Sequence, residues 1–170
     1  TDRARNYLKW ITVKAEAIDE LAPRPMHTTT RGFELLAIDR DGNSFGEIVE
    51  RSQELGIPSV LVRFASLIAT FLTVRLLRQQ MERDREVMPS LTFSQNVDAN
   101  YLNYPRTLKT LLELFPEYKE MFYFEINEEI TEDYLTTIRA LADDLGIRLA
   151  LDDTNKMNIN VHHQLLDLAD

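Results

Sequence analysis

The sequence predicts an α/β protein in which short parallel strands alternate with helices. Short apolar runs alternate along the chain with longer segments whose apolar residues recur every three or four positions. Several of the apolar runs also carry or end on an acidic or amide side chain. Helices that connect strands in this way act as crossovers, so we expect the strands to be parallel, with function gathered at their carboxyl ends.

The first half of the chain predicts two strands and two helices. β-branched residues indicate the first strand, prolines and threonines indicate a loop after it, and Gly56 ends the first helix. We expect, in order, a strand over Trp10–Ile18, a loop over Leu21–Thr30, a strand over Gly32–Ile38, a turn over Asp39–Asn43, a helix over Phe45–Leu55 and a long helix from about Ser59 to Glu86.

The second half repeats this alternation. Pro89 and Pro116 interrupt the pattern, Thr131 is in the position of an N-cap, and Gly146 closes a helix. We expect a strand over Leu91–Asn96, a helix over Thr107–Phe115, a strand over Met121–Glu125, a helix from Thr131 to Leu145, a strand over Arg148–Asp153 and a last helix with Val161, Leu165 and Leu168 facing inward.

The composition is that of a folded domain. The 170 residues suggest one domain, 1–170, and the net charge of −9 argues against binding to nucleic-acid polymers. The chain has no cysteine, which excludes disulfides and thiolate metal sites, and it begins without a signal peptide. We therefore expect a cytoplasmic domain, excised from a longer protein that can be membrane-anchored. The apolar stretch Ile57–Leu77 contains Pro58, Arg63 and Arg75, so we interpret it as a core helix and expect no membrane contact.

Oxygen-bearing side chains recur in the apolar runs, at Glu34, Asn96, Glu125 and the pair Asp152–Asp153. A buried charge without a partner is costly in free energy. Carboxylate and amide oxygens gathered at one edge of a sheet are ligands that hard divalent cations prefer. These residues therefore indicate a divalent-metal site and phosphate chemistry. Simpler interpretations stay open: Glu34 as a solvated charge, and Asn96 or the aspartates as turn or cap residues.

The ordered motifs resemble the EAL domain, a family known for cyclic di-GMP phosphodiesterases in bacterial signalling. The resemblance covers the chain from about Val13 to its C-terminus and is strongest over Phe122–Asp153. Each motif is weak alone, and only the ordered set is specific. The motifs are Glu34-Leu35-Leu36, Asn96, Glu125-Ile126-Asn127-Glu128 and Leu149-Ala150-Leu151-Asp152-Asp153.

The resemblance implies a (β/α)8 TIM-type barrel, partial or modified here to about five strands, with Mg²⁺ or Mn²⁺ at the carboxyl rim. The implied reaction is hydrolysis of cyclic di-GMP to the linear dinucleotide, in which the metal activates a water molecule and neutralises phosphate charge. The resemblance implies as metal ligands Glu34, Asn96, Glu125 and Asp152, with Asp153 as a further ligand of a binuclear site. It implies Glu125 and Asp152 as the catalytic residues. Glu128 would support the loop after the last strand.

The sequence also departs from the family pattern. Ile38 stands where the family has an Arg that helps to hold the dinucleotide, and Glu16 stands where it has a ligand-contacting Gln. An acidic side chain at that place would repel a phosphate ester. The loop after Asp153 lacks the glycines of the family. A barrel of this type usually needs about 200–250 residues, so we expect the C-terminal third of the barrel to be missing.

Three functions remain open on these residues. We favour a divergent EAL-type signalling domain, weakly active or inactive, that acts through protein contacts or as a weak ligand sensor. The alternative is an active metal-dependent phosphodiesterase, and an unrelated α/β protein is the third. The expected partners are cyclic di-GMP and either other signalling domains or a second copy of the chain.

Overall fold

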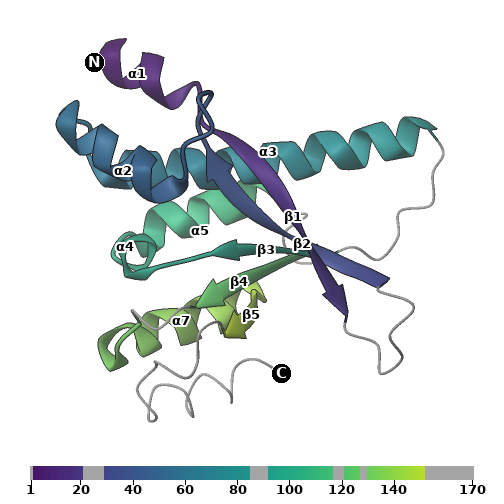
Figure 1. Cartoon of the computed structure of the whole chain (residues 1–170). Helices are drawn as coiled ribbons and strands as arrows, with labels where there is room; N and C mark the ends of the chain where they lie inside the picture. The colour runs from purple at the N-terminus through teal and green to yellow at the C-terminus, as the bar shows by residue number, and fades with distance from the viewer. Residues whose placement is uncertain (1, 21–28, 85–91, 117–120, 127–129, 152–170) are drawn as a thin grey trace. The chain divides into compact units, whose positions relative to one another are not determined.

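The computed structural model describes residues 2–20, 29–84, 92–116, 121–126 and 130–151 (Figure 1). The chain divides into two compact units, unit 1 (Thr1–Leu91) and unit 2 (Thr92–Asp170), and each is described by itself. From residue 29 on, strands alternate with helices in the described residues, which confirms the predicted α/β class. The single domain over 1–170 stays a prediction.

In its described residues, unit 1 contains two strands and three helices, and the strands are antiparallel. Residue Thr12 of the first strand lies opposite Ile38 of the second. The prediction of parallel strands is therefore wrong for this pair, because residues 21–28 are too few for the crossover that a parallel connection needs. The elements are α1 (Asp2–Leu8), β1 (Thr12–Glu20), β2 (Thr29–Ile38), α2 (Phe45–Glu54) and α3 (Ser59–Asp84).

The core of unit 1 forms where α2 and the start of α3 cover the two strands. Ile48 and Val62 are fully buried, and Ile11, Ala37 and Ile57 complete the cluster. α2 ends where predicted, because Gly56 adopts a left-handed backbone with φ of 66° that favours glycine. The chain then turns directly into α3.

Helix α3 has 26 residues and matches the predicted long helix. One of its faces is buried through Val62, Leu67, Phe71 and Val74. By length and composition the helix is long and apolar enough to cross a membrane, and 39% of its most apolar stretch is buried in the protein. Core helices of soluble proteins satisfy the same criterion, so length and composition do not decide between the two.

Unit 2 contains a parallel sheet, as the sequence predicts. Phe93 on the first of its strands lies beside Phe122 on the second, and Tyr123 on the second lies beside Arg148 on the third. The elements are β3 (Thr92–Asn96), α4 (Ala99–Leu102), α5 (Pro105–Leu114), β4 (Phe122–Ile126), α7 (Glu132–Leu145) and β5 (Arg148–Leu151). The short helix α4 is an addition to the predicted elements. α5 begins two residues earlier than predicted, since proline suits the first turn of a helix.

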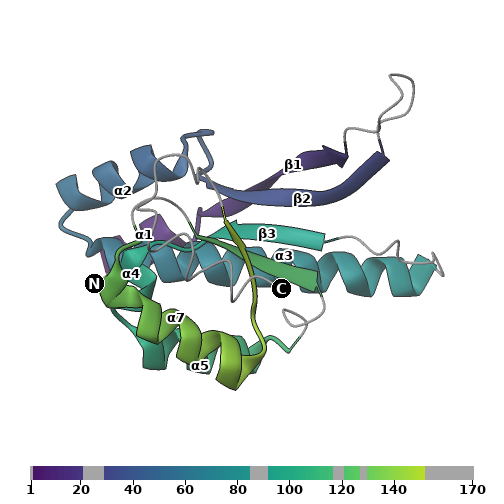
Figure 2. The same cartoon turned by 90° about the horizontal axis from the view of Figure 1, so that it is seen from below.

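The described helices of unit 2 lie on one side of its three described strands (Figure 2). Apolar side chains from both layers line one shared interior, among them Phe124, Leu149, Leu108 and Ile138. Period-two alternation within each strand directs these apolar residues to the helices. The intervening residues of the strands therefore lie on the opposite face of the sheet, where the candidate site is found.

Candidate functional site

Two of the predicted site residues lie side by side at one edge of unit 2. Asn96 is the last residue of β3, and it is in register with Glu125 near the end of β4. The backbone N–H of Val97 donates to the carbonyl oxygen of Glu125 at 2.9 Å, which extends the pairing one residue beyond the strand. Both side chains are half-buried. The parallel register thus brings an amide oxygen and a carboxylate together at the carboxyl edge of the sheet.

Strand alternation places the two side chains on the face of the sheet opposite the helices of unit 2. Glu125 alternates with the buried Phe124 and Ile126, which belong to the apolar interior. On the next strand Glu125 is in register with Ala150. A small residue there leaves room beside the carboxylate.

A second polar row lies next to this pair, and the sequence analysis missed it. Ser94, Tyr123 and Arg148 are in register across the three strands. The Arg148 guanidinium carbon lies 4.3 Å from the centre of the Tyr123 ring, and its Nη1 donates to the Tyr123 hydroxyl at 3.3 Å. Ser94 is 5% exposed, and its hydroxyl oxygen has no hydrogen-bond partner within the described part of the chain. Strand alternation, counted back two residues from Asn96 and Glu125, would have found Ser94 and Tyr123 separately, and the register of the strands places them in one row with Arg148.

Glu34 belongs to unit 1, where it lies in the middle of β2. Its direct partner across the antiparallel pair is Glu16 of β1. Two carboxylates in directly opposed positions destabilise a sheet. Lys14 offsets part of this repulsion, because its ammonium forms an ion pair with Glu16 at 2.5 Å. Residue Ile38, which stands where the family has an Arg, is the last residue of the same strand.

The remaining predicted site residues, Glu128, Asp152 and Asp153, lie outside the described residues. Strand β5 ends at Leu151, which is in register with Ile126. Among the described residues, no three His, Asp or Glu side chains come together as a metal centre would require. Within unit 2, the described residues bring Asn96 and Glu125 of the predicted ligand set together.

Asn96 is followed by a short helix whose N-cap is another residue. The helix that follows it, α4, takes its N-cap from Asp98, whose carboxylate accepts a hydrogen bond from the Asn100 backbone N–H at 2.9 Å. Asp98, rather than Asn96, is therefore the N-cap of α4. The same contact explains the acidic residue two positions after Asn96.

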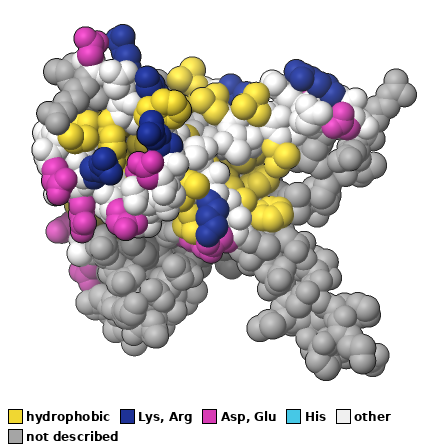
Figure 3. Space-filling model, turned by 45° about the horizontal axis from the view of Figure 1, so that its top comes forward, with side chains coloured by type: hydrophobic (Ala, Val, Ile, Leu, Met, Phe, Trp, Pro, Cys, Tyr) yellow, Lys and Arg dark blue, Asp and Glu magenta, His cyan; other side chains and the backbone are white. Residues whose placement is uncertain are grey.

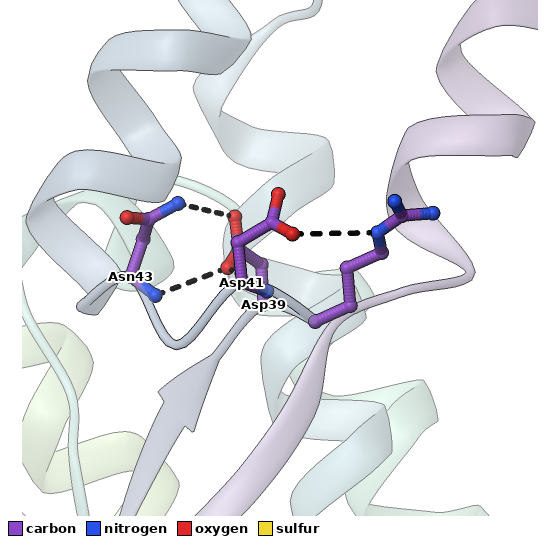
Figure 4. A network of polar contacts seen from close by, with 4 residues as sticks. Asp39, Asp41 and Asn43 are labelled. Carbon is purple, nitrogen blue, oxygen red and sulfur yellow. Dashed lines mark hydrogen bonds and ion pairs between the residues drawn. The ribbon is translucent and has the colours of Figure 1, made fainter.

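A separate group of oxygen atoms forms the turn after β2 (Figure 4). Asp39 is buried, and its carboxylate accepts hydrogen bonds from the Asp41 backbone N–H at 2.9 Å, the Asn43 backbone N–H at 3.0 Å and the Asn43 side-chain amide at 2.9 Å. Burial by itself raises the pKa of Asp39, but the bonds from Asn43 and Asp41 and the charge of Arg51 outweigh it and hold the pKa below its usual value. These donors satisfy the carboxylate, so the group is a structural turn.

Similarity to known proteins is found in structure rather than in sequence. No family model matches the chain, and no curated protein matches it in sequence. The calcium and cyclic di-GMP complex of BlrP1 from Klebsiella pneumoniae superposes with a TM-score of 0.65 at 15% identity, over 91% of this chain and 38% of that one.

Two further structures give the same result. YkuI from Bacillus subtilis, with an EAL domain in complex with cyclic di-GMP and calcium, has a TM-score of 0.60 at 21% identity, over 96% of this chain and 40% of that one. The EAL domain of FimX from Pseudomonas aeruginosa, bound to cyclic di-GMP, has a TM-score of 0.60 at 15% identity, over 97% of this chain and 66% of that one. At these identities the similarity shows the fold, which is TIM-barrel-like. The chain spans 38–66% of the lengths of these three proteins, and the predicted partial barrel fits its five described strands.

Proposed function

We propose, since the chain has the fold of an EAL domain, that it is a divergent EAL-type signalling domain, related to cyclic di-GMP phosphodiesterases, with weak turnover or none. One observation carries the proposal. Asn96 and Glu125 occupy adjacent strand ends in register, on the polar face of the sheet and at the edge where α/β folds of this kind hold their ligands.

The donor atoms of the site suit a divalent cation. Asn96 and Glu125 offer an amide oxygen and a carboxylate, the ligand types of Mg²⁺ and Mn²⁺. Glu34, Asp152 and Asp153 would complete the set. A bound cation would neutralise phosphate charge and lower the pKa of a coordinated water. The similar structures of BlrP1 and YkuI hold calcium together with cyclic di-GMP, which supports both the cation and the dinucleotide as ligands of this chain.

Two residues of unit 1 support weak turnover. Glu16, opposite Glu34, adds a second carboxylate to the strand that carries one of the predicted ligands. A phosphodiester that approached Glu34 would meet this additional negative charge and be repelled. Ile38 cannot donate the hydrogen bonds that an Arg would give to a phosphate.

The alternative proposal is an active phosphodiesterase that hydrolyses cyclic di-GMP to the linear dinucleotide. The retained pair of Asn96 and Glu125 favours it, because a domain that uses only its scaffold has no need of a half-buried carboxylate beside an amide. The two proposals differ in turnover and share the same site.

The test uses the purified chain, a Glu125→Gln variant and a matched control, Glu113→Gln. Glu113 is an exposed acid on α5 of the same unit. Calorimetry with Mn²⁺ and cyclic di-GMP measures binding, and chromatography of the nucleotide measures hydrolysis. We expect dinucleotide binding that depends on the cation, little hydrolysis, and a loss of cation affinity of about tenfold or more in Glu125→Gln, since a carboxylate ligand is lost. Glu113→Gln should bind as the unaltered chain does.

The outcomes separate the proposals. Rapid metal-dependent hydrolysis that is lost in Glu125→Gln would establish the active enzyme. Equal cation binding by the Glu125→Gln and Glu113→Gln variants would contradict the site itself. If cyclic di-GMP does not bind at concentrations of tens of micromolar, the domain would act through protein contacts instead.

A further inference from the structure

Helix α3 carries an exposed apolar stripe in addition to its buried face. The stripe consists of Leu61, Ala65, Ile68, Leu72 and Leu76, which recur every three or four residues and so lie along one side of the helix. Leu61, Ile68, Leu72 and Leu76 are 46%, 39%, 44% and 64% exposed. A surface helix of a soluble protein normally presents polar residues to water. An exposed stripe of this kind marks an interaction site.

The middle of the stripe forms one wall of a groove between α1 and α3. Leu8 and Ile11 line the wall on the side of α1, and Ala65, Ile68, Ala69 and Leu72 line the wall on the side of α3. The two alanines keep the groove open, because small side chains let another backbone approach closely. The concave shape fits a rod-like partner better than it fits a flat surface.

Basic residues border this apolar surface. Arg5 and Lys9 line the groove from α1 and are exposed. On α3, Arg75 comes seven residues after Ile68, so helical periodicity places it along the side of the stripe, and Glu82 follows seven residues after Arg75. In the view of Figure 3, hydrophobic side chains lie next to Lys and Arg side chains, and Asp and Glu side chains are present on the same face. The α1 side of the groove thus carries two basic residues, although the whole chain has a net charge of −9.

We propose that the groove between α1 and α3 binds an acidic amphipathic helix of another polypeptide. Such a helix would insert leucine-like side chains between Leu8 and Leu72 and place its carboxylates beside Arg5 and Lys9, the helix-in-groove mode of peptide recognition. From Leu61 to Leu76 the stripe is about 22 Å long at about 1.5 Å per residue, which matches a helix of about four turns. A second copy related by two-fold symmetry would bring the same basic residues to the contact, so charge disfavours it. This surface lies within unit 1 and is independent of the proposed cation site.

The test uses the full chain and a pair of synthetic helical peptides labelled with fluorescein. Each peptide has about 18 residues, about 27 Å of helix, with leucines along one face and either Glu or Lys on its flanks. Fluorescence anisotropy measures binding. Trp10, the single tryptophan of the chain, is 48% exposed and its ring lies 5.3 Å from the Lys9 ammonium. Its emission gives a second readout, because Lys9 lines the groove.

We expect the Glu peptide to bind and the Lys peptide to bind more weakly. Leu72→Glu should lower the affinity for the Glu peptide by at least about tenfold, because a charge would replace an apolar contact. Leu114→Glu is the matched control, since Leu114 is a 63% exposed leucine on α5 of unit 2, and it should have no effect. The double variant Arg5→Glu/Lys9→Glu should reverse the preference in favour of the Lys peptide. Circular dichroism confirms that each variant is folded.

Several results would overturn the proposal. The proposal is wrong if neither peptide binds. It is also wrong if the double variant Arg5→Glu/Lys9→Glu still prefers the Glu peptide over the Lys peptide. If the chain forms a dimer, and if Leu72→Glu dissociates this dimer while the Glu peptide does not, the surface binds a second copy of the chain. Binding to phosphatidylserine vesicles that Leu72→Glu abolishes, without binding of the Glu peptide, would assign it to a membrane.

Discussion

The turn that follows β2 allows a sharp test of the structure, because one buried carboxylate holds it together. Three hydrogen bonds of 2.9–3.0 Å converge on Asp39, one of them from the side-chain amide of Asn43. The variant Asn43→Ala removes only this last bond and keeps the backbone N–H. A hydrogen bond to a charged group contributes about 1.5–3 kcal/mol. Asn43 is half-buried, so we expect a loss near the lower limit, about 1.5 kcal/mol in the free energy of unfolding.

Urea unfolding followed by the fluorescence of Trp10 measures this loss. The Arg40 guanidinium carbon lies 5.4 Å from the centre of the Trp10 ring, so the only tryptophan reports on the turn itself. Asp41→Ala is the matched control in the same turn. It removes an exposed ion pair with Arg40 at 3.5 Å and should cost no more than about 0.5 kcal/mol.

The charge on Asp39 also gives the turn a defined pH dependence. Its pKa is lower in the folded protein than in the unfolded chain. The resulting stabilisation is therefore present above the unfolded pKa, about 3.9, and is lost as the pH falls through the folded value. The stability difference between the unaltered chain and Asp39→Asn should be largest near neutral pH and should shrink in acid. Two results would refute this account of the turn. One is an equal free energy of unfolding for Asn43→Ala and Asp41→Ala. The other is a stability difference between the unaltered chain and Asp39→Asn that is as large in acid as at neutral pH.

Two further predictions concern the helices. Leu112 is fully buried in unit 2, so Leu112→Ala should destabilise the protein by about 2–5 kcal/mol, whereas Leu114→Ala, at a 63% exposed position, should change stability by less than about 0.5 kcal/mol. Equal effects in thermal melts would contradict the packing of α5. The Ser44 hydroxyl and backbone N–H both donate to the Glu47 carboxylate at 2.7 Å before α2. Ser44→Ala should cost about 0.5–1 kcal/mol, and an unchanged urea midpoint would show that the cap has no effect.

Local chemistry allowed much of the secondary structure to be predicted. The apolar spacing of Phe45, Ile48 and Val49 predicted α2, and Gly56 and Gly146 ended their helices because each has positive φ, at 66° and 63°. These features depend on residues within a few positions of one another. A single chain segment therefore contains all the information that they need.

The candidate site could be predicted only in part. The sequence proposed Asn96 and Glu125 separately, and the register of β3 with β4 placed them side by side. The adjacent row of Ser94, Tyr123 and Arg148 was missed because cross-strand neighbours are distant in sequence.

By itself, the sequence determined where helices and strands form, which glycines end helices, and which polar residues stand at strand ends, because these depend on periodicity and local backbone preference. Only the tertiary structure decided that β1 runs antiparallel to β2, that Glu16 faces Glu34, and that the stripe of α3 from Leu61 to Leu76 stays exposed. Strand direction and register follow from hydrogen bonds between distant segments. An apolar helix likewise does not reveal from its composition which of its faces the rest of the chain will cover.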